Sequence, residues 1–261
     1  MRDELSDLHG DEKDPVKVSQ RAMRKPLPKR FYTSVAVEEA DGVFQVTLDG
    51  RIVKTPGRAP LQFQPQVFAE RLAHEFDAQA EEINPATMPF YRLANTAFDG
   101  VATDLQAVRE DIIRFSGSDL LCYRAAGPDG LVALQAQHWD EPLDWMAGLV
   151  GSRFVLAEGI MHVSQPKAAT AGFGALVAQY DDPLAVSAFH VMTTLTGSAI
   201  LAFGVMRGEM TAQEAWTAAH VDEDWNIAQW GEDAHAQALR ASKWIDMDVA
   251  AFVAATLNPA T

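Results

Sequence analysis

The sequence predicts an α+β fold in which a small N-terminal domain with an antiparallel β-meander and helices is followed by an all-α C-terminal domain. Two observations lead to this prediction. Residues 31–56 contain β-favouring runs on both sides of an Asp-Gly pair, and Asp-Gly favours a two-residue hairpin turn. From about residue 65 onward, apolar residues recur at spacings of three or four, which is typical of helices.

Composition divides the chain into three parts. Residues 1–28 are polar, charged and dotted with prolines, so they cannot form much core and we expect a flexible segment. Residues 29–118 are expected to form the α+β domain. A Ser-Gly-Ser break at 116–118 precedes the predicted helical domain, residues 119–261.

The predicted meander has three strands. The first covers Phe31 to Val37, a loop follows over 38–42, and the second ends at Leu48. Asp49 and Gly50 predict a tight turn into a third strand over 51–55, because both turn positions require positive φ. Such a sheet needs a cover on its apolar face. The next segment, 65–83, has one apolar helical face and can provide it.

The remaining chain shows helical periodicity between proline, glycine and capping signals. The expected helical segments are 90–115 with a break near Gly100 and a capping box at Thr103, 131–139, a helix opened by Pro142 and capped by Asp140, 166–180, a helix opened by Asp182-Pro183, a helix after Gly197 that ends at Gly208, and the segment after Thr211. Residues 153–163 are expected to be extended.

Charge and cysteine content restrict the class of protein. The net charge of −15 disfavours nucleic acid and anionic membrane surfaces as partners. The single cysteine, Cys122, fits a reducing compartment and a buried position. The N-terminus contains no signal or transit peptide pattern, so we expect the protein in a bacterial cytoplasm. We also expect it to be a monomer. The apolar stretch 183–207 contains His190 and several hydroxyl residues, which indicates two buried helices and no membrane insertion.

The sequence contains no pattern that specifies catalysis or metal binding. The histidines are not spaced for a zinc site, and no phosphate-binding loop or nucleophile elbow occurs. Ser164 and Lys167 match a Ser-x-x-Lys pattern, but Pro166 opposes the helical turn that would join them. We therefore expect no catalytic residue and no metal site.

Residues 211–244 stand out because they hold four of the six tryptophans and many carboxylates. Thr211 and Glu214 form a predicted capping box. Counting about 100° per residue, Trp216, Ile227 and Trp230 lie on one apolar stripe. Glu223 lies on that stripe, where a carboxylate is costly, and Trp225 lies on the opposite, polar side.

Two interpretations remain open for these side chains. In the first, Glu223 meets an internal base and Trp225 packs on another helix. In the second, this surface binds a partner protein through aromatic anchors surrounded by acidic groups. A second aromatic cluster contains Trp139 and Trp145, which are either core residues or part of an exposed apolar site.

An ordered set of short matches resembles the assembly chaperones that hold the unassembled α subunit of the ATP synthase F1 sector in mitochondria and related bacteria. The matching residues are Arg30-Phe31-Tyr32, Leu48-Asp49-Gly50-Arg51 with Lys54-Thr55-Pro56, Asp77-Ala78-Gln79 with Ile83, Pro85, Met88 and Pro89, Leu93-Ala94-Asn95-Thr96-Ala97, Asp119-Leu120 with Tyr123-Arg124, Trp139-Asp140 with Pro142 and Trp145, and Gln229-Trp230-Gly231. The resemblance covers nearly the whole chain after residue 28.

The resemblance implies a non-enzymatic protein without a cofactor that shields the F1 α subunit until it pairs with β. It also implies a functional acidic region at Asp222, Glu223 and Asp224, although this chain has Asp222 where glutamate is expected and Asn226 where glutamine is usual. The candidate partner-binding residues are Asp222, Glu223, Asp224, Trp225, Glu232 and Trp139. The alternative functions are a small-molecule enzyme using carboxylates in an interdomain cleft and a general holdase.

Overall fold

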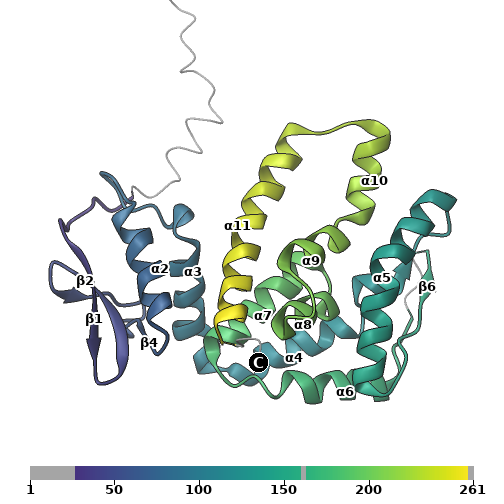
Figure 1. Ribbon diagram of the computed structural model, residues 1–261, viewed down its shortest axis with the longest axis horizontal. Helices are drawn as coiled ribbons and strands as arrows, with labels where there is room; N and C mark the ends of the chain where they lie inside the picture. Colours follow the sequence, from purple (N-terminus) through teal and green to yellow (C-terminus); the bar gives the residue numbers. More distant parts are fainter. Residues whose placement is uncertain (1–26, 160–162, 258–261) are drawn as a thin grey trace, which may run out of the picture.

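The computed structural model describes residues 27–159 and 163–257. Residues 1–26 of the predicted flexible segment 1–28 therefore lie outside the described residues. Figure 1 shows a small sheet at one end of the molecule, with α2 and α3 between the sheet and the helical remainder. The predicted α+β fold with a helical C-terminal part is confirmed.

The N-terminal sheet is antiparallel. Its strands are β1 (Val35–Ala40), β2 (Val43–Leu48), β3 (Arg51–Ile52) and β4 (Gln62–Phe63). β1, β2 and β3 pair in sequence order, as the meander requires, and β4 adds a fourth strand against β2 that the sequence did not predict. Asp49 and Gly50 have φ of 47° and 75°, as expected for the hairpin turn.

The predicted loop over 38–42 is wrong. β1 continues to Ala40, opposite Val43 of β2, and only Asp41 and Gly42 form the turn. Their φ values of 52° and 79° match those of the other Asp-Gly pair. The same dipeptide therefore makes both hairpin turns.

The apolar face of the sheet is covered by α2 (Gln66–Asp77), which buries Phe68, Leu72 and Phe76. Glu75 on the same helix is also buried, and its carboxylate accepts hydrogen bonds from the backbone N–H groups of Phe90 (2.7 Å) and Tyr91 (2.8 Å). These two N–H groups lie in the first turn of α3 (Pro89–Asn95), where they have no partner within their own helix. Glu75 of α2 therefore provides the hydrogen-bond acceptors for the N-terminus of α3.

The helical remainder follows the predicted breaks in most places. Its helices are α4 (Leu105–Ser116), α5 (Asp129–Val150), α6 (Lys167–Val177), α7 (Pro183–Thr196), α8 (Ala199–Arg207), α9 (Ala212–Ala219), α10 (Val221–Trp230) and α11 (Ala234–Leu257). The chain also contains the short 3-10 helices η1 (Pro85–Thr87), η3 (Val101–Thr103) and η4 (Leu120–Cys122), the π-helix η2 (Thr96–Gly100), and the parallel pair β5 (Tyr123–Arg124) and β6 (Ala157–Glu158). Gly197 and Gly208 end α7 and α8 with positive φ, and Asp182 caps α7 as predicted.

Two local predictions are wrong. Pro142 does not open a helix but lies inside α5, which runs unbroken from Asp129 to Val150. Burial of Trp139, Leu143 and Met146 on one side of this helix compensates for the loss of the backbone hydrogen bond that a proline cannot donate. The N-cap of α4 is Asp104, which accepts from the backbone N–H of Ala107, and not Thr103.

One hydrophobic core extends from the sheet to α5. Within it α4, which the predicted boundary assigns to the N-terminal domain, packs on α6 and α7. The boundary near residue 118 stays a prediction. Cys122 is buried as expected. Among the described residues, none of the helices is long and apolar enough to cross a membrane.

Asp119 links two elements of this core. It is fully buried, and its carboxylate accepts from the backbone N–H groups of Leu121 (3.1 Å) and Ile200 (3.1 Å), at the starts of η4 and α8. Burial raises the pKa of Asp119 to about 6, although the hydrogen bonds to its carboxylate lower it. The folded protein therefore holds a proton on Asp119 at pH values where the unfolded chain has released it.

Replacing Asp119 by asparagine is expected to remove one pH-dependent contribution to stability. Because the pKa is higher in the folded state, this contribution is complete below the unfolded pKa and is lost as the pH rises through about 6. The shift corresponds to about 3 kcal/mol. Urea unfolding from about pH 4 to pH 8 should show the wild-type free energy falling relative to the variant by about 2–3 kcal/mol. Parallel pH profiles for the two proteins would contradict this assignment.

Candidate functional site in the C-terminal helices

The segment that begins at Thr211 folds into three helices. α9 starts with the predicted capping box, in which Thr211 Oγ1 accepts from the N–H of Glu214 (3.2 Å) and the Glu214 carboxylate accepts from the N–H of Thr211 (2.7 Å). His220, with φ −111° and ψ 17°, separates α9 from α10. Gly231, with φ 88° and ψ 174°, ends α10. The prediction of one apolar stripe through this segment is therefore wrong, because each break resets the helical phase.

Exposure changes sharply along these helices. Trp216 is buried and its ring lies 5.4 Å from that of Trp244, so this part holds α9 and α11 together. Trp230 is 86 % exposed, although the sequence placed it with Trp216 on the apolar stripe that was expected to pack on the body. We call residues 221–241 the arm, since Figure 1 shows α10 and the start of α11 rising from the body as a helical hairpin.

Asp222 belongs to the attachment of the arm. Its Oδ1 accepts a hydrogen bond of 2.6 Å from Nε2 of Gln135 on α5. Gln135 is itself buried and accepts from the backbone N–H of Ala125 through Oε1 (2.8 Å). Asp222 therefore fixes the first turn of α10 to α5.

Trp225 makes a second contact with α5. A Cβ atom added to Gly130 would lie 2.6 Å from Cη2 of this indole, so the absence of a side chain at Gly130 lets the ring approach the α5 backbone. Trp225 is partly buried there. This packing matches the structural interpretation of Trp225.

Glu223 and Asp224 face the opposite side of α10, toward α11. Asp224 forms a bidentate ion pair with Arg240 of α11, in which Nη2 lies 3.2 Å from Oδ2. The hydrogen bond to Asp224 raises the pKa of Arg240, so the guanidinium stays charged. Glu223 is less constrained, because its side chain is 43 % exposed and its carboxylate lies 3.8 Å from Nε2 of His220. Burial lowers the pKa of His220, which favours the neutral imidazole.

Trp139 is not available to a partner, and its predicted contact role is wrong. Its side chain is fully buried, and Nε1 donates a hydrogen bond of 2.7 Å to the carbonyl oxygen of Ala218 on α9. The guanidinium carbon of Arg124 lies 5.3 Å from the indole centroid. Asp140 pairs with Arg124 at 2.8 Å and caps no helix. Trp139 therefore positions α5 against α9.

A groove of about 770 Å³ lies between α10 and α11. It is lined by Glu223, Asp224, Asn226, Ile227, Trp230, Gly231, Glu232, Asp233, Ala236, Gln237, Arg240 and Ala241. Three predicted contact residues, Glu223, Asp224 and Glu232, thus share one site, whereas Asp222, Trp225 and Trp139 do not line it. Trp230, Asp233 and Arg240 were missed. The signal for Trp230 was Gly231, a helix stop directly after an aromatic residue.

Comparison with known proteins shows to which family the chain belongs. A family model described as ATP12 chaperone protein matches residues 29–147. The crystal structure of the Atu1473 protein from Agrobacterium tumefaciens matches with a TM-score of 0.84 at 50% sequence identity, covering 95% of this chain and 92% of that chain. The crystal structure of Atp12 from Paracoccus denitrificans matches with a TM-score of 0.81 at 35% identity, covering 88% and 98% of the two chains. The chain belongs to the ATP12 chaperone family.

Membership of the ATP12 family confirms the resemblance to F1-ATPase assembly chaperones. It also implies a non-enzymatic role, because the family is one of chaperones. The acidic region that the resemblance indicated corresponds to the first turn of α10, where the three acids point in two directions. Asp222 faces α5, and the other two line the groove.

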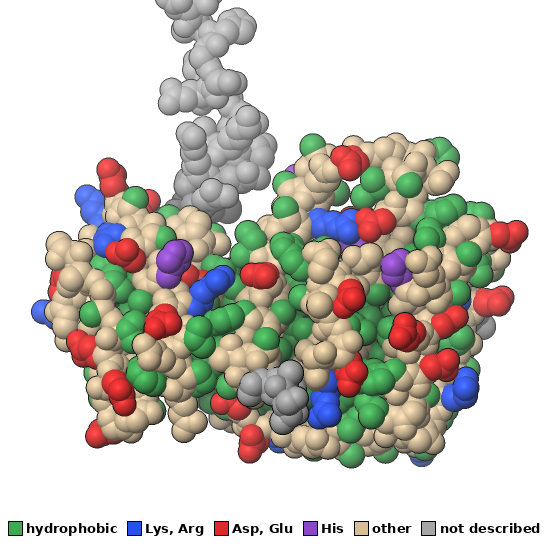
Figure 2. Space-filling view, in the orientation of Figure 1, with side chains coloured by type: hydrophobic (Ala, Val, Ile, Leu, Met, Phe, Trp, Pro, Cys, Tyr) green, Lys and Arg blue, Asp and Glu red, His purple; other side chains and the backbone are tan. Residues whose placement is uncertain are grey.

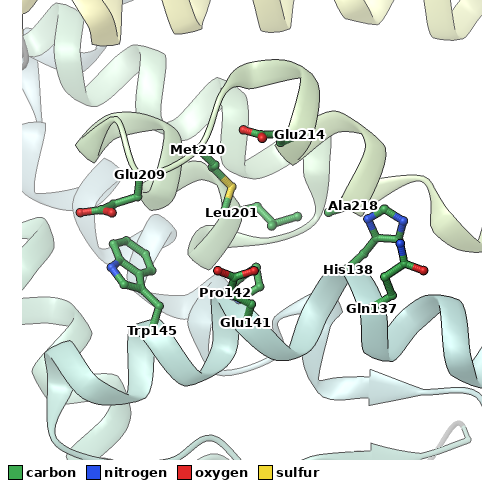
Figure 3. Close-up of a pocket in the computed structure, with 10 residues that line it drawn as sticks. All are labelled: Gln137, His138, Glu141, Pro142, Trp145, Leu201, Glu209, Met210, Glu214 and Ala218. Atoms are coloured by element: carbon green, nitrogen blue, oxygen red, sulfur yellow. The ribbon is translucent and has the colours of Figure 1, made fainter.

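A second cavity bears on the enzyme alternative. It has about 290 Å³ and lies between α5, α8 and α9, with Glu141, Glu209 and Glu214 on its wall (Figure 3). Hydrogen bonds from Thr211 lower the pKa of Glu214, so this carboxylate is unsuited to act as a general acid. Across the residues that the structure describes, no three histidine, cysteine or acidic side chains are placed to hold a metal ion. The cavity lies within the helical part, and no observation there favours catalysis.

Proposed function

We propose that this ATP12-family protein holds the unassembled F1 α subunit until α pairs with β, and that it binds α through the arm. The proposed place of action is the bacterial cytoplasm, with the chaperone as a monomer. The observation that carries the proposal is the exposure of Trp230, 86 % of whose surface is open to solvent beside a groove of about 770 Å³.

An exposed tryptophan in such a position is suited to binding a protein. Aromatic side chains bury about 150–250 Å² each and dominate interface energies. Around Trp230, the sequence of the arm contains five acidic residues and one arginine. That balance favours a client surface with excess positive charge. Figure 2 shows the arm at the upper edge of the molecule, where a large partner can reach it.

The predicted acidic residues take different roles in this proposal. Glu223 and Glu232 contact the client, because both are accessible on the groove side. Asp224 also lines the groove, but its charge is matched by Arg240. Asp222 and Trp225 set the orientation of the arm through their contacts with α5.

Charge reversal in the groove is expected to weaken client binding. The double variant Glu223→Lys with Glu232→Lys should bind purified F1 α at least about tenfold more weakly, because it replaces attraction to a basic surface by repulsion. The matched control is Glu39→Lys with Glu81→Lys, which makes the same change in net charge at two exposed sites away from the arm. The measurement is a titration of each variant with F1 α, and with F1 β as the second partner.

The proposal requires three results. Wild type must bind α in preference to β, the control must bind α like wild type, and the groove variant must lose affinity. Equal affinity of wild type for α and β would instead indicate a general holdase. Equal loss in the groove variant and the control would show that only overall charge matters.

A further inference from the structure

We propose that the groove between α10 and α11 receives an amphipathic helix of the client whose flanks are basic. This inference rests on the proposed function, because it describes how the client occupies the same site. It goes further by assigning the secondary structure and the charge of the bound segment.

The two walls of the groove belong to α10 and α11, which residues 231–233 join at the tip of the arm. Ile227 and Trp230, three residues apart on α10, form the apolar part of one wall. Ala236 and Ala241 lie on the α11 wall, where small side chains allow close approach of another backbone. Arg240 and Asp224 join the two helices by their ion pair. The groove therefore has apolar side chains on both walls and an ion pair that joins the walls.

The backbone structure of the two walls favours a helical client segment over an extended one. Both walls are α-helical, so their N–H and C=O groups are hydrogen-bonded within each helix. An extended client segment would find no free backbone edge here and would bury unpaired polar groups. A client helix satisfies its own backbone and presents one apolar face, so it can pack in the groove as a third helix against α10 and α11.

The charges on the groove specify basic flanks for that helix. Glu223, Glu232 and Asp233 line the groove, while its one arginine is already paired with Asp224. An apolar strip flanked by lysine or arginine matches this lining, since aliphatic stems of basic side chains also cover apolar surface. An acidic helix would be repelled.

Filling the groove tests this arrangement. Ala241→Trp places a large side chain in the groove, whereas Ala238→Trp places the same side chain at an exposed position of α11 outside the groove lining. With the full-length protein and purified F1 α, we expect Ala241→Trp to bind at least about 30-fold more weakly, as for loss of an interface hot spot. We expect Ala238→Trp to bind like wild type. Circular dichroism and thermal unfolding of both variants should match wild type, because both positions are exposed.

The outcomes separate this inference from the proposed function. If wild type binds α and Ala241→Trp binds equally well, the client does not bind in the groove, although the proposed chaperone function stands. If wild type does not bind α, the proposed function fails and this inference falls with it.

Crosslinking identifies the bound segment directly. A p-benzoylphenylalanine in place of Gln237, which lines the groove, should crosslink to one peptide of F1 α under ultraviolet light. Mass spectrometry is expected to place the crosslink in a net-positive segment with apolar residues at helical spacing. A crosslink to an acidic segment or to a segment with strand alternation would overturn the assignment.

Discussion

Replacing Trp230 by alanine is expected to weaken binding of F1 α by about 30-fold or more without lowering the stability of the free protein. The indole is 86 % exposed, so truncation removes little from the folded chain. In the complex with F1 α, the substitution removes the largest apolar side chain of the groove. Loss of a hot-spot tryptophan typically costs about 2 kcal/mol or more of binding free energy.

The measurement pairs a titration with F1 α and a urea unfolding curve for each protein. Leu149→Ala is the matched control, because Leu149 is also an exposed apolar residue at 47 % but does not line the groove. The control should retain wild-type affinity. Retention of wild-type affinity by Trp230→Ala would remove the arm from the binding site.

Replacing Trp139 by alanine is expected to have the opposite pattern, with a loss of stability of about 3–5 kcal/mol. Its side chain is fully buried, so truncation leaves a cavity between α5 and α9. It also leaves the carbonyl oxygen of Ala218 without the hydrogen bond from Nε1, which adds to the cost. Any loss of client binding by this variant would then follow from loss of folded protein.

Trp139→Phe separates packing from hydrogen bonding. The ring retains most of the buried volume but cannot donate to Ala218, so the loss of stability should be smaller than for alanine. Urea unfolding measures both variants. A loss below about 1 kcal/mol for Trp139→Ala, which is typical of exposed sites, would contradict the structural role.

Local chemistry explains which parts of the fold could be predicted. Asp-Gly turns, the Thr211 capping box, and the glycines that end α7 and α8 act within a few residues, so their signals are present in the sequence. Pro142 and β4 depend on distant partners instead. Pro142 is tolerated inside α5 because that helix is held by packing. β4 pairs with Phe44 and Gln45 of β2, a contact that its own two residues do not signal in the sequence.

The candidate site was predicted in its composition but not in its geometry. The tryptophans and acids of residues 211–244 indicated a surface of interest. Their orientation could not be predicted, because His220 and Gly231 interrupt the helical phase. Trp225 could not be placed either, since its position depends on Gly130, which lies far away in the sequence.

Hydrogen exchange on the full-length protein is the most direct test of the claim that the arm binds the F1 α subunit. Amides can be compared in the free chaperone and in mixtures with purified F1 α or F1 β, by mass spectrometry of peptides that cover α10 and the start of α11. If the arm binds the client, α, and not β, slows exchange across residues 221–241, where the tip is exposed in the free protein. Protection by α confined to other elements, with the arm unchanged, would contradict it.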